Sequence, residues 1–190
     1  MDRDTRQLEH TLMSATPIAF PIAEALLAGL DHEAFMAAFA DVAEHSPWVA
    51  EDAFAAGPFV RREDLIGAFE AAMRAASHEQ QLALIRAHPD LAGRAAIAGD
   101  IAEDSRKEQA GAGLDRLTAE EFARFTMLND AYRARFGFPF IFAVKGATKH
   151  MILDAFEARL GNSPQAEFET ALTQISRIFR FRLEDRVLTA

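Results

Sequence analysis

His88 is the residue whose type and position best suit acid–base chemistry. A helical segment opens at Ser77 and should end at about Ala87, because Pro89 disfavours helical backbone angles in the residue before it. His88 would then lie at the negative end of a helix dipole, which favours the imidazolium, and a nearby carboxylate would favour it further. This setting suits a general acid or base near neutral pH. The alternative, which position alone favours, is a capping histidine bonded to a backbone carbonyl.

Ser105 and Glu108 are a second pair of candidates. Their spacing is that of a capping box, in which both side chains bond the first turn of a helix. Taken alone, the pattern favours this structural interpretation. In the functional alternative both side chains turn from the helix N-terminus toward His88. The free N–H groups of that N-terminus could also bind an anion.

Arg182 continues an apolar stripe on the last predicted helix. The stripe consists of Phe168, Leu172, Ile175 and Phe179. The same rhythm then reaches Arg182 and Arg186, although arginine is seldom buried unless it is paired. Arg182 therefore has two interpretations. It faces a carboxylate or a pocket that binds one, or it extends beyond the core into solvent. The sequence leaves Arg182 open, whereas for Arg186 we favour the solvent interpretation.

The segment Phe138-Pro139-Phe140-Ile141 is apolar and extended rather than helical. It could be a plug of the hydrophobic core. It could also be a pocket wall, because no helix uses its backbone N–H groups and they are free to bind a ligand. Lys145 follows this segment, but nothing besides its position supports a Schiff-base role, and we expect it on the surface.

Several kinds of chemistry are disfavoured by what the sequence lacks. It has no cysteine, hence no disulfide, thiolate nucleophile or Cys-ligated metal. Its six histidines form no HExxH pattern, and GxSxG, Walker A and GxGxxG motifs are missing. The formal charge of −9 repels nucleic acid and anionic lipid, although local arginines can still bind a small anion. We expect no metal site, no nucleic-acid partner and no membrane partner.

These candidates require a helical frame, and the composition predicts one. The chain has 190 residues, a size typical of one domain, with 39 Ala, which favours helix, and only 5 Val, which favours strand. Helix starts are predicted at Asp31, Ser46-Pro47, the Ser77/Gln80 and Thr118/Glu121 capping boxes, and Ser163-Pro164. Gly137 should end the helix that runs to Phe136, and the last helix should reach about Arg186. We predict an all-α, single compact domain of about eight helices.

The first 29 residues are treated separately. Residues 1–16 are polar and aperiodic, which predicts a loose tail, and a short helix should follow before the main domain at 30–190. The acidic start is unlike a signal peptide, and the longest uncharged apolar stretch, 136–144, is too short to span a bilayer. The C-terminus lacks the Ser-Lys-Leu peroxisomal address, so we expect a cytoplasmic protein.

Taken together, the motifs of residues 30–188 resemble one family, the 2-oxo-4-hydroxy-4-carboxy-5-ureidoimidazoline (OHCU) decarboxylases of uric acid degradation. Each motif is short, but their order and spacing agree throughout. In chain order the motifs are His45-Ser46-Pro47-Trp48-Val49-Ala50-Glu51, His88-Pro89-Asp90-Leu91-Ala92-Gly93-Arg94, Ser105, Glu108-Gln109, Ala112-Gly113-Leu114, Leu128-Asn129, Tyr132, Phe136-Gly137-Phe138-Pro139-Phe140-Ile141, Arg159-Leu160-Gly161-Asn162 and Arg182-Leu183.

The resemblance implies a cofactor-free helical enzyme, usually a homodimer, that removes CO₂ from OHCU to give (S)-allantoin. By resemblance, His88 is the catalytic histidine, Glu108 its acidic partner that keeps it oriented, and Arg182 the substrate-binding arginine. Pro89 and Ser105 would contact the substrate, and Phe138, Pro139, Phe140 and Ile141 would offer backbone contacts. Urate oxidase and 5-hydroxyisourate hydrolase would be its pathway neighbours. Residues 1–29 have no counterpart in this resemblance.

Two other classes compete with the decarboxylase. A metal-dependent helical hydrolase needs several metal ligands, including an adjacent His-Asp pair, and the chain has no such pair. A non-catalytic helical module that binds a small carboxylate would tolerate loss of His88 and Glu108. The complete set of charged pocket residues argues against this second class.

Overall fold

The computed structural model describes residues 21–93 and 101–189, and this part of the chain is almost entirely helical. The predicted all-α class is therefore confirmed. The α-helices in the described residues are α1 (His32–Phe39), α2 (Trp48–Phe54), α3 (Arg62–Ala75), α4 (His78–Ala87), α6 (Glu103–Gly111), α7 (Ala119–Phe136), α8 (Lys149–Arg159) and α9 (Pro164–Arg186). A 3₁₀-helix, η1 (Glu24–Gly29), precedes them. The tail predicted for residues 1–16 lies outside the described residues.

Most of the predicted helix ends are confirmed by their capping contacts. Asp31 accepts a hydrogen bond from the Ala34 N–H at 2.9 Å, which fixes the start of α1. The Ser77/Gln80 and Thr118/Glu121 capping boxes are both complete. Gly137 has φ +76°, a left-handed angle that favours glycine, and it ends α7.

Two predicted helix starts are wrong. α2 begins at Trp48 with Pro47 in the capping position, and the Ser46 carbonyl accepts from the Val49 N–H at 3.1 Å. α6 begins at Glu103 with Ala102 before it, so Ser105 and Glu108 lie inside the helix and form no capping box. The same three-residue spacing then places both side chains on one face of α6, where neighbours three and four apart meet.

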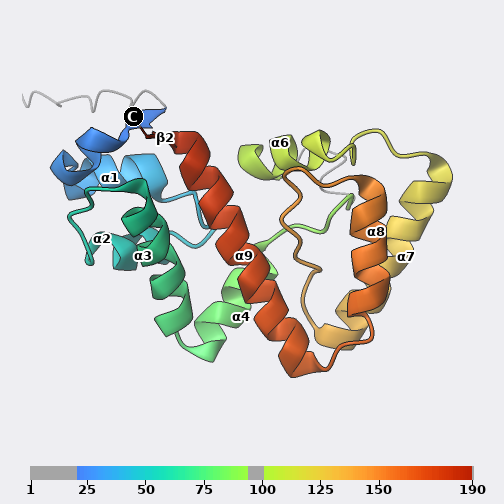
Figure 1. The fold of residues 1–190 in the computed structure, drawn as a ribbon. Helices are drawn as coiled ribbons and strands as arrows, with labels where there is room; N and C mark the ends of the chain where they lie inside the picture. Colours follow the sequence, from blue (N-terminus) through green and yellow to red (C-terminus); the bar gives the residue numbers. More distant parts are fainter. Residues whose placement is uncertain (1–20, 94–100, 190) are drawn as a thin grey trace, which may run out of the picture.

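α9 crosses the middle of the molecule and organises the rest (Figure 1). In this view α1, α2 and α3 lie on one side of α9, α7 and α8 on the other, and α3, α4 and α7 each contact it. Its predicted apolar stripe is buried, since Leu172, Ile175 and Phe179 are at most 1% exposed. A buried central helix of this kind can carry polar residues into the interior at chosen positions.

A short parallel ladder joins distant parts of the chain. β1 (Ile22–Ala23) pairs with β2 (Val187–Leu188), directly after α9. The Arg62 guanidinium donates to the Val187 carbonyl at 3.0 Å beside this ladder. Two-residue strands carry no alternation pattern, which is why the sequence did not predict them.

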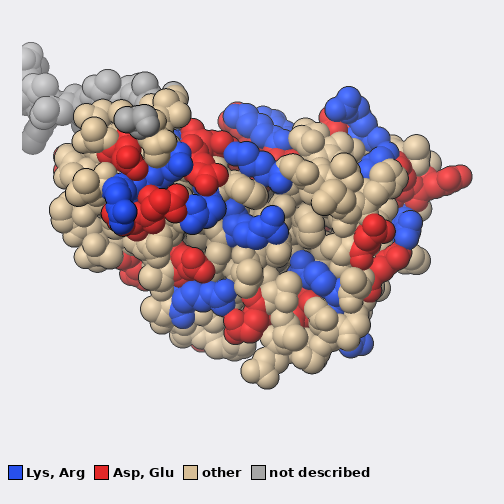
Figure 2. Space-filling view, in the orientation of Figure 1, with Lys and Arg blue, Asp and Glu red and all other residues tan. Residues whose placement is uncertain are grey.

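Acidic and basic side chains are mixed on the face shown in Figure 2. Exposed ion pairs link α3 to α9, with Arg180 on Glu63 and Arg74 on Glu169, both at 2.9 Å. Lys145 is exposed and pairs with Asp185, as its predicted surface position requires. Within the described residues, no helix is both long and apolar enough to cross a membrane.

Candidate active site

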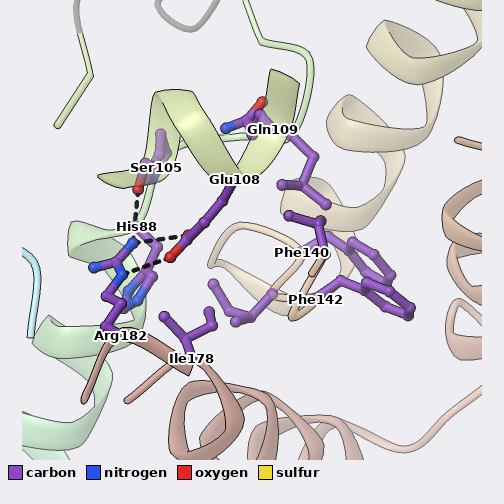
Figure 3. Close-up of a pocket in the computed structure, with 12 residues that line it drawn as sticks. His88, Ser105, Glu108, Gln109, Phe140, Phe142, Ile178 and Arg182 are labelled. Atoms are coloured by element: carbon purple, nitrogen blue, oxygen red, sulfur yellow. Dashed lines mark hydrogen bonds and ion pairs between the residues drawn. The ribbon is translucent and has the colours of Figure 1, made fainter. Parts of the chain in front are cut away.

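A pocket beside α9 brings most of the predicted site residues together (Figure 3). About 340 Å³ of space not filled by protein atoms lies here, including space that is open to solvent. The residues that line it are His88, Pro89, Leu91, Ser105, Glu108, Gln109, Phe140, Ile141, Phe142, Val144, Ile178 and Arg182. Of the predicted residues, Phe138 and Pro139 do not line it.

His88 combines both interpretations given to it from the sequence. It caps α4, and because the Leu84 carbonyl oxygen can only accept, His88 Nδ1 donates the hydrogen bond of 2.9 Å between them. A neutral ring then has its lone pair on Nε2, a buried atom with no hydrogen-bond partner in the described part of the chain. His88 also lines the pocket.

The prediction that the imidazolium is favoured is wrong. Burial lowers the pKa of His88, and the positive charge of Arg182 lowers it further, while the Leu84 carbonyl and Glu44 only partly oppose this. The helix end and the carboxylate act in the expected direction but are outweighed by desolvation. His88 is therefore neutral near pH 7, with Nε2 ready to accept a proton.

Arg182 is paired within the interior. Its Nε donates to Glu108 Oε1 at 2.8 Å and its Nη2 to Glu108 Oε2 at 3.0 Å, a bidentate contact. Nη2 also donates to Ser105 Oγ at 3.1 Å, and Nη1 to the Val42 carbonyl at 3.1 Å. Burial is the largest single effect and lowers the pKa of Arg182, but the Glu108, Glu44 and Asp104 carboxylates together outweigh burial and raise that pKa above its ordinary value. The solvent interpretation of Arg182 is wrong.

Arg186 also contradicts its prediction, because it does not extend freely into solvent. Its Nη2 lies 2.6 Å from Asp104 Oδ2, and its Nη1 pairs with Asp41 and donates to the Ala38 carbonyl at 2.9 Å. Asp41 follows α1 and Asp104 lies on α6, so carboxylates from two distant segments bind the Arg186 guanidinium.

Within the described residues, Glu108 makes its hydrogen bonds to Arg182 and none to His88. Both of its carboxylate oxygens accept from Arg182, and the His88 ring is oriented by Leu84. Figure 3 shows Ser105 and Glu108 extending from α6 toward Arg182. The two residues therefore line the pocket and also bind its arginine.

The extended segment before α8 is both core plug and pocket wall. Phe138 is buried next to Tyr132 and Phe168, away from the pocket. Phe140 and Ile141 reach the pocket, and the Ile141 carbonyl accepts from Arg159 Nη1 at 2.7 Å. One half of the segment thus anchors it while the other half lines the cavity.

Three polar residues near the pocket were given no role from the sequence, although Gln109 and Asn129 belong to its motifs. Gln109 Oε1 accepts from the Ala92 N–H, and Asn129 Nδ2 donates to the Leu91 carbonyl, both at 2.9 Å, so they hold the turn after His88. Gln109 stands four residues after Ser105 on α6, a spacing that could have revealed it. The third, Glu44, lies in the connection after α1, where no helical periodicity points to it.

No cluster of three or more His, Asp or Glu suited to a metal ion occurs among the residues described. The pocket instead offers a proton acceptor, a guanidinium and apolar walls. Together with the all-α fold, these groups indicate a class: a helical protein with a pocket suited to a small polar anion.

The comparisons with known proteins agree with this class. The sequence model of the OHCU decarboxylase family matches residues 28–184, and the chain belongs to this family. The 2-oxo-4-hydroxy-4-carboxy-5-ureidoimidazoline decarboxylase of Haloferax volcanii is 43% identical over 83% of this chain and 91% of its own length.

Two further relatives extend the comparison. The uric acid degradation bifunctional protein PucL of Bacillus subtilis is 42% identical over 82% of this chain, which spans 31% of that longer protein. The crystal structure of an (S)-allantoin synthase aligns with a TM-score of 0.71 at 31% identity. That alignment covers 87% of this chain and 54% of the solved one, so this chain spans about half of it.

Proposed function

We propose that this protein is a carboxy-lyase that converts OHCU to (S)-allantoin in uric acid degradation, without a cofactor. The observation that carries the proposal is a neutral, buried His88 beside the Arg182–Glu108 pair, in one pocket of a chain that belongs to the OHCU decarboxylase family. The relatives named for this reaction and for uric acid degradation support the same assignment.

The proposed chemistry needs little beyond the substrate itself. A carboxylate beside a polarised C=N can leave as CO₂, because the electron pair of the breaking carbon–carbon bond moves toward the nitrogen. The nitrogen takes up one proton from water, the substrate hydroxyl loses its proton as a carbonyl forms, and one proton is added to the neighbouring carbon. The protein has to hold the anion, stabilise the developing charge and deliver that proton to one face.

His88 is proposed to move the proton. Its Nδ1 is committed to the Leu84 carbonyl, so Nε2 is the nitrogen that takes the hydroxyl proton and returns a proton to carbon. The depressed pKa keeps Nε2 unprotonated at neutral pH, as a base requires. A fixed ring that protonates one face gives a single enantiomer.

The remaining site residues are proposed to bind the substrate. Arg182 and the neighbouring Ser105 would bind the polar edge of the substrate. Glu108, the partly exposed carboxylate partner of Arg182, would fix the position of the guanidinium. Pro89 would form a wall next to His88. Phe138 and Pro139 lie outside the pocket, which leaves Phe140 and Ile141 for the proposed backbone contacts.

The proposal extends to the protein's context. We propose a cytoplasmic homodimer that works beside urate oxidase and 5-hydroxyisourate hydrolase, since OHCU is the product of their successive reactions. Residues 30–190 would form the decarboxylase domain, with residues 1–29 as a separate N-terminal segment.

The test generates OHCU in situ from urate with the two upstream enzymes and follows product by circular dichroism. Rapid appearance of (S)-allantoin with the wild type, and its loss in His88→Ala, is expected. Slow racemic product at the spontaneous rate would refute the proposal and favour a helical module that binds a small carboxylate. Full activity in His88→Ala would refute the role of that residue alone.

A further inference from the structure

We propose that Glu44 is a positioning residue that sets the donor direction of Ser105 and the place of Arg182. Glu44 lies in the connection between α1 and α2 and does not line the pocket, so it acts through these two residues and not on substrate. The inference rests on the proposed function, because it assigns Glu44 a part in the same site.

Glu44 is a carboxylate in the interior, with only 2% of its side chain exposed. Its Oε2 accepts a hydrogen bond from Ser105 Oγ and lies 3.5 Å from Arg182 Nη2. A buried carboxylate is costly unless it is paired and hydrogen-bonded, and both contacts lead directly into the candidate site. The buried Glu44 carboxylate is therefore tied to the candidate site and does not only stabilise the α1–α2 connection.

The donor inventory fixes the orientation of the Ser105 hydroxyl. A guanidinium can only donate and an ionised carboxylate can only accept. Ser105 Oγ therefore accepts from Arg182 Nη2 and gives its single proton to Glu44. Toward a ligand, Ser105 is left with a lone pair, so it selects an N–H or O–H group and repels a carboxylate oxygen.

The connection that carries Glu44 also holds Arg182 on the side away from Glu108. Arg182 Nη1 donates to the Val42 carbonyl, two residues before Glu44, while Nε and Nη2 hold the Glu108 carboxylate. The guanidinium is thus held between α6 and the α1–α2 connection. Loss of the Glu44 carboxylate would leave the Val42 carbonyl as the remaining contact on this side.

Glu44 also acts on His88 through its charge. The groups that face the His88 ring are Arg182 from α9, Glu44 and His45 from the connection, and Glu108 across the pocket. Of these, Glu44 opposes the effect of Arg182 and favours the protonated ring. Removing its charge should make His88 harder to protonate.

The experiment compares Glu44→Gln with the matched variant Glu51→Gln, which removes an exposed carboxylate on α2. In Glu44→Gln we expect kcat/KM per folded molecule to fall about 10- to 100-fold, as for loss of a buried hydrogen bond to a charged group. The acid limb of the pH profile and the NMR titration midpoint of His88, assigned with His88→Gln, should move to lower pH. Glu51→Gln should change none of these.

Several outcomes would overturn the proposal. One is wild-type kcat/KM in Glu44→Gln, and another is a loss matched by the unfolded fraction with an unchanged pH profile, as a merely structural residue would give. If Glu44→Gln does not fold, Glu44→Asp takes its place, and wild-type kcat/KM in that shorter carboxylate would overturn the proposal. If the wild type does not decarboxylate OHCU, the proposed function fails. The role of Glu44 is tested separately: an unchanged NMR titration midpoint of His88 in folded Glu44→Gln would overturn it.

Discussion

The protein contains two buried arginine–glutamate networks that are built alike but differ in what surrounds them. In one, Arg182 meets Glu108, Glu44 and Ser105. In the other, Glu167 of α9 is fully buried and accepts from Arg159 Nε at 2.7 Å, Asn162 Nδ2 at 2.7 Å and the Tyr132 hydroxyl. Both join α9 to neighbouring segments by charge-assisted hydrogen bonds.

The difference lies in whether protein encloses the network. Arg159 lies 4.3 Å from the centre of the Phe140 ring and donates to the Ile141 carbonyl, and neither Arg159 nor Glu167 lines the pocket. Arg182 and Glu108 do line the pocket, and the Glu108 side chain is 23% exposed. A closed network of this kind holds structure, whereas an open one keeps charge available to a ligand. Arginine–carboxylate geometry alone does not distinguish the two.

Breaking the closed network should give the largest effect on stability. Glu167→Gln leaves the Arg159 guanidinium without its carboxylate, and removing one partner of a buried pair costs about 3–5 kcal/mol. Urea denaturation measures the free energy of unfolding. Glu169→Gln, two residues later on α9 and exposed, should change it by less than about 0.5 kcal/mol. Equal losses in the two variants would show that the closed network has no special role in stability.

Changing the open network should affect activity more than stability. Lysine cannot reproduce the bidentate contact of Arg182 with Glu108, so Arg182→Lys should lower kcat/KM for OHCU by about 10- to 100-fold. Its unfolding free energy should change less than that of Glu167→Gln, because Glu108 can reach water. The control is Arg180→Lys on the exposed face of α9. Wild-type kcat/KM in Arg182→Lys would contradict the substrate-binding role.

The smallest expected effect is the pH dependence of stability that His88 adds to the open network. Its folded pKa is below its unfolded value, so the unfolded chain takes up a proton first as the pH falls. This contribution is complete above the unfolded pKa near 6.5 and is lost as the pH falls toward the folded pKa, by at most about 1.4 kcal/mol per pH unit. The free energy of unfolding, measured by urea titration between pH 7.5 and 5, should therefore fall more steeply with decreasing pH for the wild type than for His88→Gln. Parallel curves would refute the depressed pKa.

Much of the frame could be predicted because helix ends have local causes. The capping hydrogen bonds of the Ser77/Gln80 and Thr118/Glu121 boxes, and the bond from the Gly137 N–H to the Arg133 carbonyl, each span only a few positions. The apolar stripe of α9 likewise singled out Arg182, although it left open whether this side chain is buried or extends to solvent.

The site itself depends on contacts that no local pattern contains. Ser105 and Glu108 satisfy the spacing of both a capping box and an inward helix face, and only the actual start of α6 decides between them. The Asp41 and Asp104 partners of Arg186 come from far along the chain, as does the Glu44 partner of Ser105. The neutral form of His88 reflects the extent of its burial, which sequence position does not reveal.

The short β1–β2 ladder has a consequence for motion. A helix end usually frays, and its amide protons then exchange quickly with solvent. Here the residues that follow α9 are paired with Ile22 and Ala23, and the Val187 carbonyl is bonded to Arg62. The last turn of α9, which begins one residue after Arg182, can therefore open only when the ladder separates too. The helix turn that follows Arg182 is thereby tethered at its C-terminal end.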